Sequence, residues 1–161
     1  MDTAHGLGKE RKSSQAATFT LMAPPDILHD GPVLLYDGSC GVCSQAVQWV
    51  LAHERSHFLR FAPIESAVGN ELRARAGVAP DVDSMLWTEL REGRIRADIR
   101  SSALLRVLGY VGGPWRCFAA LRFVPAVLRD AAYRAFAKVR YRLRAQACLV
   151  PNAQERARFL L

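Results

Sequence analysis

The chain has 161 residues and half of them are apolar, which suits one domain with a sizeable core and leaves room for one appendage. No apolar run reaches the length needed to span a bilayer, so a transmembrane protein is not expected. The formal net charge of +7 belongs to the last third, since residues 1–115 carry 12 Lys and Arg against 13 Asp and Glu, and residues 116–161 carry 10 against 2. Such a basic block suits contact with nucleic acid, anionic lipid or an acidic partner.

Residues 1–28 are predicted to be a loose, polar N-terminal extension. Its apolar stretch is short, interrupted by threonines and followed by Pro24 and Pro25, so it makes a poor signal peptide. Met22 could serve as an alternative initiator. Four cysteines without a secretory signal favour a reducing compartment over a structural disulfide framework, and a cytoplasmic location is therefore expected.

Residues 29–111 are predicted to form the core of the fold, with elements in the order βαβαββα. These are a strand at 33–36, a helix to residue 54, a strand at 58–62, a helix from Ser66 to just before Gly77, a hairpin of 84–90 and 94–99 around Glu92-Gly93, and a helix capped by Ser101 that runs through 108. Strands joined through helices should run parallel, and the hairpin adds an antiparallel strand. The order predicts an α/β fold with a mixed four-stranded sheet and helices on both faces, which is the thioredoxin-like pattern.

Residues 112–161 are predicted to be a basic helical extension that packs on this core. A Gly-Gly-Pro-Trp segment at 112–115 can start a new helix, which Pro125 ends or kinks. Beyond it, apolar residues at helical spacing predict a second helix with a buried stripe, and basic residues line another of its faces. The stripe comprises Leu128, Ala131, Ala132, Ala135, Phe136, Val139 and Leu143, and the basic face holds Arg134, Lys138 and Arg142.

Two cysteines, Cys40 and Cys43, lie at the predicted turn from the first strand into the first helix. Free N–H groups and the positive dipole end at a helix start favour thiolate over thiol, and the thiolate is the form that attacks a disulfide. Cys43 continues an apolar stripe with Ala46, Val47 and Val50, so it should face the core. Cys40 lies at the open helix start. The pattern predicts an exposed attacking thiol, Cys40, and a shielded resolving thiol, Cys43.

Two other interpretations of the cysteines stay open. The pair could be small core residues or a permanent disulfide, and Cys117, in an apolar context, is predicted to be a core residue. A zinc site with His53 and His57 is the next alternative, but only nine residues separate Cys43 from His53, fewer than the twelve to fifteen of a zinc finger. No second Cys-x-x-Cys is present. Neither a metal nor a cofactor is therefore expected.

The chain resembles the DCC family of thiol-disulfide oxidoreductases, which takes its name from an Asp-x-x-Cys-x-x-Cys motif. The matching segments follow one another from residue 33 to residue 161, and their ordered set makes the resemblance specific. They are Tyr36-Asp37-Gly-Ser-Cys40-Gly-Val-Cys43, Gly112-Gly-Pro-Trp115, Arg129-Asp130-Ala-Ala-Tyr133, Arg140-Tyr141-Arg142, Cys148-Leu-Val-Pro151 and Arg158-Phe-Leu160. The resemblance implies a thioredoxin-like fold, disulfide exchange with a disulfide- or thiol-bearing protein or small molecule, and an unidentified electron donor or acceptor.

The same resemblance implies a catalytic site of Asp37, Cys40 and Cys43. Asp37 could take a proton from Cys43 as a general base, or it could only shape the turn before the helix, as its short acceptor side chain does well. Cys148 stands at the family's C-terminal cysteine position, as a third redox thiol or as a packed residue.

The chain departs from thioredoxin in two places, which keeps other functions in view. Gly41-Val42 replaces the usual spacer between the cysteines, and no proline stands near Asp83-Ser84, where thioredoxins place a cis-proline facing them; Pro80 comes a few residues early. One alternative function is a binding module built on the basic C-terminal helix, and another is a redox-inactive interaction domain. Nucleic acid is not an expected partner, because aromatic interleaving is sparse and no nucleic-acid motif is present.

Overall fold

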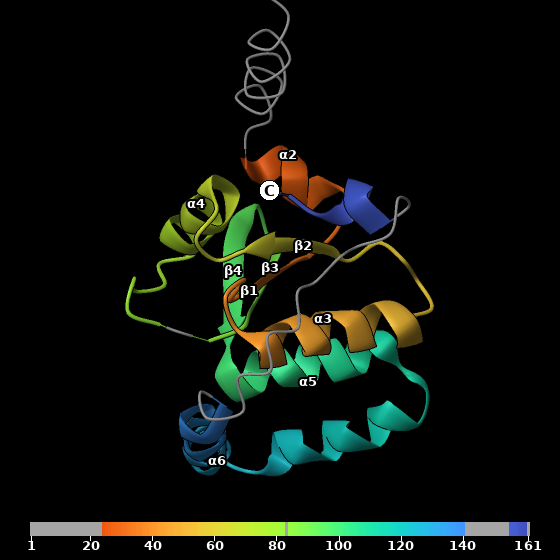
Figure 1. The fold of residues 1–161 in the computed structure, drawn as a ribbon, viewed down its shortest axis with the longest axis vertical. Helices are drawn as coiled ribbons and strands as arrows, with labels where there is room; N and C mark the ends of the chain where they lie inside the picture. The colour runs from red at the N-terminus through yellow and green to blue at the C-terminus, as the bar shows by residue number, and fades with distance from the viewer. Residues whose placement is uncertain (1–23, 83, 141–154, 161) are drawn as a thin grey trace, which may run out of the picture.

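The computed structural model describes residues 24–82, 84–140 and 155–160, and it is built around a four-stranded sheet (Figure 1). The strands are β1 (Val33–Tyr36), β2 (Arg60–Pro63), β3 (Leu86–Arg91) and β4 (Arg94–Ile99). Their order across the sheet is β2-β1-β3-β4, with β1 parallel to β2 and the pairs β1–β3 and β3–β4 antiparallel. The predicted mixed sheet is confirmed. The first strand matches its prediction residue for residue.

Helices cover both faces of the sheet, as predicted for a thioredoxin-like fold (Figure 1). On one face lie α3 (Gly41–His53) and α5 (Arg100–Val111), and on the other lie α2 (Pro24–His29) and α4 (Ala67–Arg75). Alternate residues of β1 lie on opposite faces of the sheet, since Leu34 packs in the α3–α5 core and Leu35 packs in the α2–α4 core. All four residues of β1 are buried because the strand is central and covered on both sides.

Strand direction differs from the prediction at one point. The helix α3 joins two parallel neighbours, β1 and β2, as expected. The helix α4 instead leads from β2 to β3, which runs antiparallel to β1 and lies on the far side of it. The rule for helical crossovers applies to strands that are parallel within the sheet, and β3 joins the sheet in the opposite direction as the first half of a hairpin. The hairpin turn has Glu92 and Gly93 at φ 51° and 72°, the left-handed values of a two-residue turn.

Local sequence signals predicted most of the helix ends. The Ser66 hydroxyl accepts a hydrogen bond from the Gly69 N–H at 3.1 Å and caps α4, and Gly77 follows that helix with φ 69°. The predicted cap at Ser101 is wrong, since Ile99 is the N-cap of α5. Ser101 lies in the first turn, and its hydroxyl donates to the Asp130 carboxylate of a later helix.

The first described residues are helical, although the sequence predicted a loose segment there. Residues 24–28, which the sequence assigned to it, belong to α2, and the side chains of Ile27 and Leu28 are each only 4% exposed. They pack in the α2–α4 core, where they cover Val33 and Leu35 of the sheet. Residues 1–23 lie outside the described residues.

The C-terminal third folds back on the core through α5 and through its last residues. A 3₁₀ helix, η1 (Gly113–Phe123), and α6 (Ala126–Arg140) both contact α5, and η2 (Glu155–Arg158) follows after residues 141–154, which lie outside the described residues. The Leu160 N–H donates to the Phe61 carbonyl at 2.8 Å, so the terminal segment lies along the outer edge of β2. The division of the chain at residue 112 stays a prediction.

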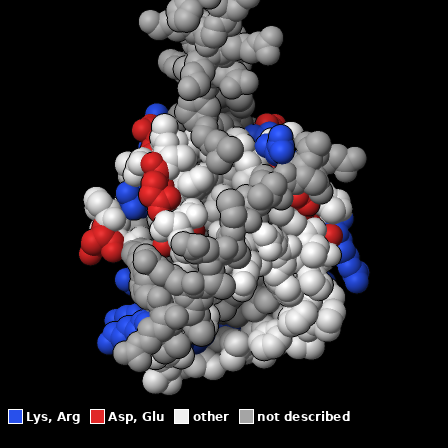
Figure 2. Space-filling view, in the orientation of Figure 1, with Lys and Arg blue, Asp and Glu red and all other residues white. Residues whose placement is uncertain are grey.

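The apolar stripe of α6 is less buried than predicted. Leu128 and Phe136 are 63% and 51% exposed, because they line an open hollow between α5, η1 and α6 rather than a closed core. Arg134 and Lys138 are exposed, and basic side chains gather over α6 at the lower left of the face in Figure 2. Cys117, predicted in the core, is exposed on η1. None of the helices in the described part of the chain is long and apolar enough to cross a membrane.

Candidate active site

The two cysteines lie at the start of α3, directly beyond the carboxyl end of β1. A turn at Asp37 connects β1 to this helix start. The Asp37 Oδ1 accepts hydrogen bonds from the Ser39 N–H at 2.9 Å and from the Ser39 hydroxyl at 2.7 Å. The Cys40 N–H closes the turn on the Asp37 carbonyl at 3.2 Å. Cys40 is the N-cap of α3, with extended φ and ψ of −92° and 112°, and Cys43 is the third helical residue. An N-cap side chain reaches back toward this third residue, so the helix start brings the two sulfurs to the same turn.

The start of α3 presents free backbone N–H groups next to Cys40. The first N–H groups of an α-helix have no intrahelical acceptor and carry the positive end of the dipole. The first turn of α3 holds no acidic residue that would offset this field, and Cys40 makes no side-chain capping hydrogen bond in the described structure. No disulfide joins Cys40 to Cys43 in the structure.

The predicted difference in exposure between the two thiols is wrong. Cys40 is 6% exposed and Cys43 is 4% exposed, so both are buried. Both belong to the apolar cluster between α3, α5 and the sheet, which also holds Tyr36 and Met85. A cap position is open in an isolated helix, but here the neighbouring strand ends cover it.

Asp37 forms the turn that one interpretation of the sequence predicted for it. Its side chain is 8% exposed, and its Oδ1 is engaged with Ser39. These hydrogen bonds would form with an asparagine oxygen as well, so they do not require a charge. The role of Asp37 as a base stays a prediction, and Cys148 lies outside the described residues.

The structure adds Ser84 to the surroundings of this turn. Ser84 lies two residues before the start of β3, the strand that pairs with β1. Ser84 is 3% exposed, and its hydroxyl has no hydrogen-bond partner in the structure as described. The described residues contain no cis peptide bond, and Asp83 is outside them. The sequence marked this position only by comparison with thioredoxin, and it held no sign of a buried hydroxyl.

A second buried polar cluster lies at the other end of α3, and no pattern in the sequence predicted it. Glu54 caps this helix end, and its carboxylate accepts hydrogen bonds from the Tyr110 hydroxyl at 2.7 Å and from Arg158 Nη2 at 2.8 Å. A second bond joins Arg158 Nη1 to Glu54, and Arg158 Nε donates to the Leu59 carbonyl at 2.9 Å. The cluster therefore fastens the C-terminal segment to the core, and we call it the Glu54 clasp.

The clasp shifts the pKa values of its acidic groups. Burial alone would raise the pKa of Glu54, but the hydrogen bonds from Arg158 and Tyr110 and the charge of Arg158 together lower it. Burial and the hydrogen bond to Glu54 raise the pKa of Tyr110 to about 12. His57 Nδ1 lies 3.4 Å from Glu54 Oε1, and His53 Nδ1 lies 2.8 Å from the Trp49 carbonyl. No group of three His, Cys, Asp or Glu side chains in the described ranges is placed to hold a metal ion.

The fold and the cysteine pair together define a thioredoxin-like protein with a Cys-x-x-Cys site at the first strand–helix turn. Residues 34–146 match the family described as DCC1-like thiol-disulfide oxidoreductase, and the chain belongs to that family. The uncharacterized protein YuxK of Bacillus subtilis (strain 168) is 32% identical over 131 residues, which cover 80% of this chain and 93% of that protein. A DCC family protein of Arabidopsis thaliana, described as chloroplastic, is 34% identical over 121 residues, or 73% of this chain and 68% of that one. No solved structure matches the chain significantly.

Proposed function

We propose that this protein exchanges disulfides through its cysteine pair, with Cys40 as the attacking thiol and Cys43 as the resolving thiol. The observation that carries the proposal is the position of the two cysteines in one turn at the start of α3, with Cys40 at the N-cap and Cys43 as the third helical residue, not joined by a disulfide. The description of the family as thiol-disulfide oxidoreductases supports the reaction class.

In the reductive direction the reaction has two steps. The Cys40 thiolate attacks one sulfur of the substrate disulfide, which forms a mixed disulfide and releases the other substrate sulfur as a thiolate. The Cys43 thiolate then attacks the Cys40 sulfur, which releases the second substrate thiol and leaves a Cys40–Cys43 disulfide. Two electrons pass from the protein dithiol to the substrate, and an external dithiol restores the reduced pair. The oxidative direction is the same sequence reversed.

Asp37 is proposed as the base that accepts the Cys43 proton in the second step. It stands at the turn that leads into the Cys-x-x-Cys helix, and a buried carboxylate near a buried thiol can take up its proton as the thiolate forms. The alternative is that Asp37 only holds the turn. The cytoplasmic location and a third redox role for Cys148 stay predictions from the sequence.

Burial of both thiols has a kinetic consequence for this mechanism. A substrate sulfur must reach Cys40 in line, so the site has to open locally before the first step. Exposed Cys117 should therefore react with an alkylating agent before either site cysteine does in the folded protein. For this reason, experiments on the site are best done with Cys117 and Cys148 replaced by serine.

The test is the stoichiometry of reaction with the aromatic disulfide 5,5′-dithiobis(2-nitrobenzoate), in that two-serine background. With both site cysteines present, we expect two thionitrobenzoate ions released per chain and none retained. Cys43→Ser should release one and retain one as a stable mixed disulfide, and the matched Cys40→Ser variant should react much more slowly. Retention of the label by Cys40→Ser and not by Cys43→Ser would reverse the assigned roles. A lack of reaction in all three proteins would contradict disulfide exchange itself.

A further inference from the structure

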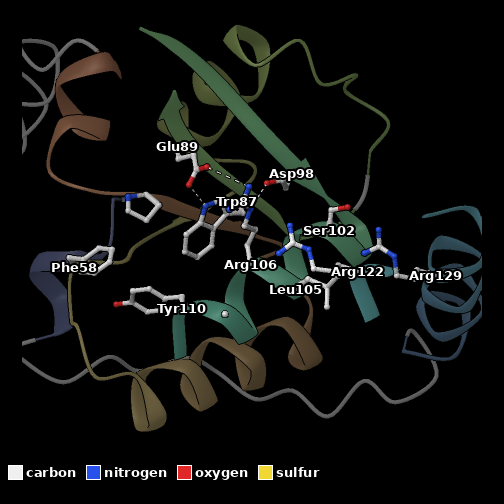
Figure 3. A pocket seen from close by; sticks show the side chains of 12 residues that line it. Phe58, Trp87, Glu89, Asp98, Ser102, Leu105, Arg106, Tyr110, Arg122 and Arg129 are labelled. Atoms are coloured by element: carbon white, nitrogen blue, oxygen red, sulfur yellow. Dashed lines mark hydrogen bonds and ion pairs between the residues drawn. The ribbon is translucent and has the colours of Figure 1, made fainter. Parts of the chain in front are cut away.

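A hollow of about 590 Å³ lies beside α5, and none of residues 37–43, which form the cysteine turn, lines it (Figure 3). Its volume falls within the range of small-molecule sites in proteins, about 300 to 1,000 Å³. Side chains from β3, β4, α5, η1 and α6 line it, so residues far apart in the sequence converge there. Neither the cysteine chemistry nor the Glu54 clasp uses its cationic side.

One side of the hollow is aromatic and offers a ligand only apolar surface. Figure 3 shows the rings of Phe58, Trp87 and Tyr110 on this side. The Trp87 N–H already donates to Glu89 Oε2 at 2.9 Å. The Tyr110 hydroxyl donates to Glu54 at 2.7 Å and accepts from the Leu59 N–H at 3.2 Å. Because these polar atoms are engaged within the protein, this side favours a flat apolar group.

The opposite side is cationic. In Figure 3 the guanidinium groups of Arg122 and Arg129 lie along it with Ser102, whereas that of Arg106 lies between Glu89 and Asp98. Arginine has donors and no acceptor, so a ligand on this side has to bring acceptor oxygens. A carboxylate matches a guanidinium fork, with two parallel hydrogen bonds.

The acidic residues of the hollow do not neutralise this side. Asp98 pairs with Arg106 Nε at 2.9 Å, and Glu89 pairs with Arg91 outside the hollow and lies 4.0 Å from Arg106 Nη2. Among the described residues, no acidic side chain forms an ion pair with Arg122 or Arg129. The Nε of Arg129 donates to the Val124 carbonyl at 3.1 Å, which orients its fork. Two positive charges therefore remain without a counter-charge in the described part of the chain.

We propose that this hollow is a binding site for a small organic anion, a carboxylate attached to a flat apolar group. The apolar group lies on Phe58 and Tyr110, and the carboxylate is held by Arg122 and Arg129. The site is a feature of this chain's α5–η1–α6 corner, and it does not depend on the cysteine reaction.

The test uses two probes of the same shape, 2-naphthoate and its uncharged amide, titrated by calorimetry into the full-length reduced protein. We expect naphthoate to bind at least tenfold more tightly than the amide, since a hydrogen bond to a charged group is worth on the order of tenfold or more in affinity. Arg122→Gln should remove about that factor for naphthoate and leave the affinity of the amide unchanged. Arg116→Gln is the matched control, because it removes the same charge from η1 at a residue outside the hollow.

Three results would overturn the proposal. The first is equal affinity for the two probes, and the second is no detectable binding of naphthoate at millimolar concentration. The third is an equal loss of naphthoate affinity in Arg116→Gln and Arg122→Gln, which would mean that general charge and not the hollow attracts the anion. Since binding is measured without turnover and with both cysteines intact, its failure is separate from failure of the thiol chemistry.

Discussion

Replacing Arg158 by methionine should destabilise the fold strongly, because it leaves a buried carboxylate without its cation. The side chain of Glu54 is 0% exposed and that of Arg158 is 16% exposed. Methionine keeps most of the apolar stem of the arginine and removes its donors. The loss includes the hydrogen bonds from Arg158 to Glu54 and those to the Leu59 carbonyl.

Breaking a buried ion pair by removing one partner costs about 3–5 kcal/mol. Tyr110 still donates to Glu54 in the variant, and Arg158 is slightly exposed, so the lower end of this range, about 3 kcal/mol, is expected. In a domain of this size 1 kcal/mol lowers the melting temperature by about 2–4 °C, which gives a decrease of roughly 6–12 °C. Circular dichroism during heating and urea titration would measure both quantities.

A double-mutant cycle separates the pair from its surroundings. Glu54→Met combined with Arg158→Met removes both charges, and replacing a buried pair with apolar groups is often close to neutral. We therefore expect the double variant to be more stable than Arg158→Met alone. A double variant less stable than either single one, with additive losses, would refute the idea that the buried charges depend on each other.

The pH dependence gives an independent check. The folded-state pKa of Glu54 lies below its unfolded value, so the clasp contributes fully above about pH 4.3, the usual pKa of glutamate, and is lost as the pH falls through the lower folded pKa. The parent should therefore lose more stability than Arg158→Met between pH 5 and pH 3. Parallel stability curves for the two proteins would contradict the assigned cause of the pKa shift.

Three further predictions concern the core, the turn and the C-terminal helix. Gly69→Ala should lower the free energy of unfolding, measured by urea titration, by more than about 1–3 kcal/mol, because the added Cβ would clash with the Pro63 carbonyl oxygen. In the control Gly109→Ala the added Cβ meets nothing within 4 Å, so this variant should be more stable than the parent. Equal urea midpoints for the two variants would refute the clash. Asp37→Asn should keep the turn and the melting temperature but lower turnover in a disulfide-reduction assay by about ten- to a thousandfold if Asp37 is a base, and full turnover would leave it as a turn former. Phe136→Asp should cost only about 1 kcal/mol, because this side chain is already 51% exposed, and a much larger loss in thermal unfolding would show that the stripe is buried in solution.

Much of the fold can be predicted from local sequence patterns alone. The apolar run at 33–36 is short and bounded by turn residues, which is enough to place a buried strand. Ser66 and Gly77 mark the two ends of α4 because a capping hydroxyl and a left-handed glycine act within one turn of the chain. The cysteine motif was placed correctly for the same reason, since a strand followed at once by a helix fixes which residues start that helix.

The surroundings of the site depend on contacts between distant segments, and these are decided by the tertiary structure. Cys40 is buried because strand ends and helices far along the chain cover the helix start, and no local pattern reports that cover. The same holds for Ser84, which is 3% exposed although no local pattern marks it as buried. Cys117 is exposed although its neighbours in sequence are apolar, because η1 faces solvent at that point.

The Glu54 clasp shows most clearly what local sequence patterns cannot predict. Glu54 and Arg158 are 104 residues apart, and each is an ordinary charged residue in its own segment. What the sequence determined alone is the order of the elements and the chemistry available at the first helix start. Only the folded chain decided which side chains are buried, which charges pair, and which distant residues line the hollow beside α5, because periodicity and caps act over a few residues and packing acts across the whole molecule.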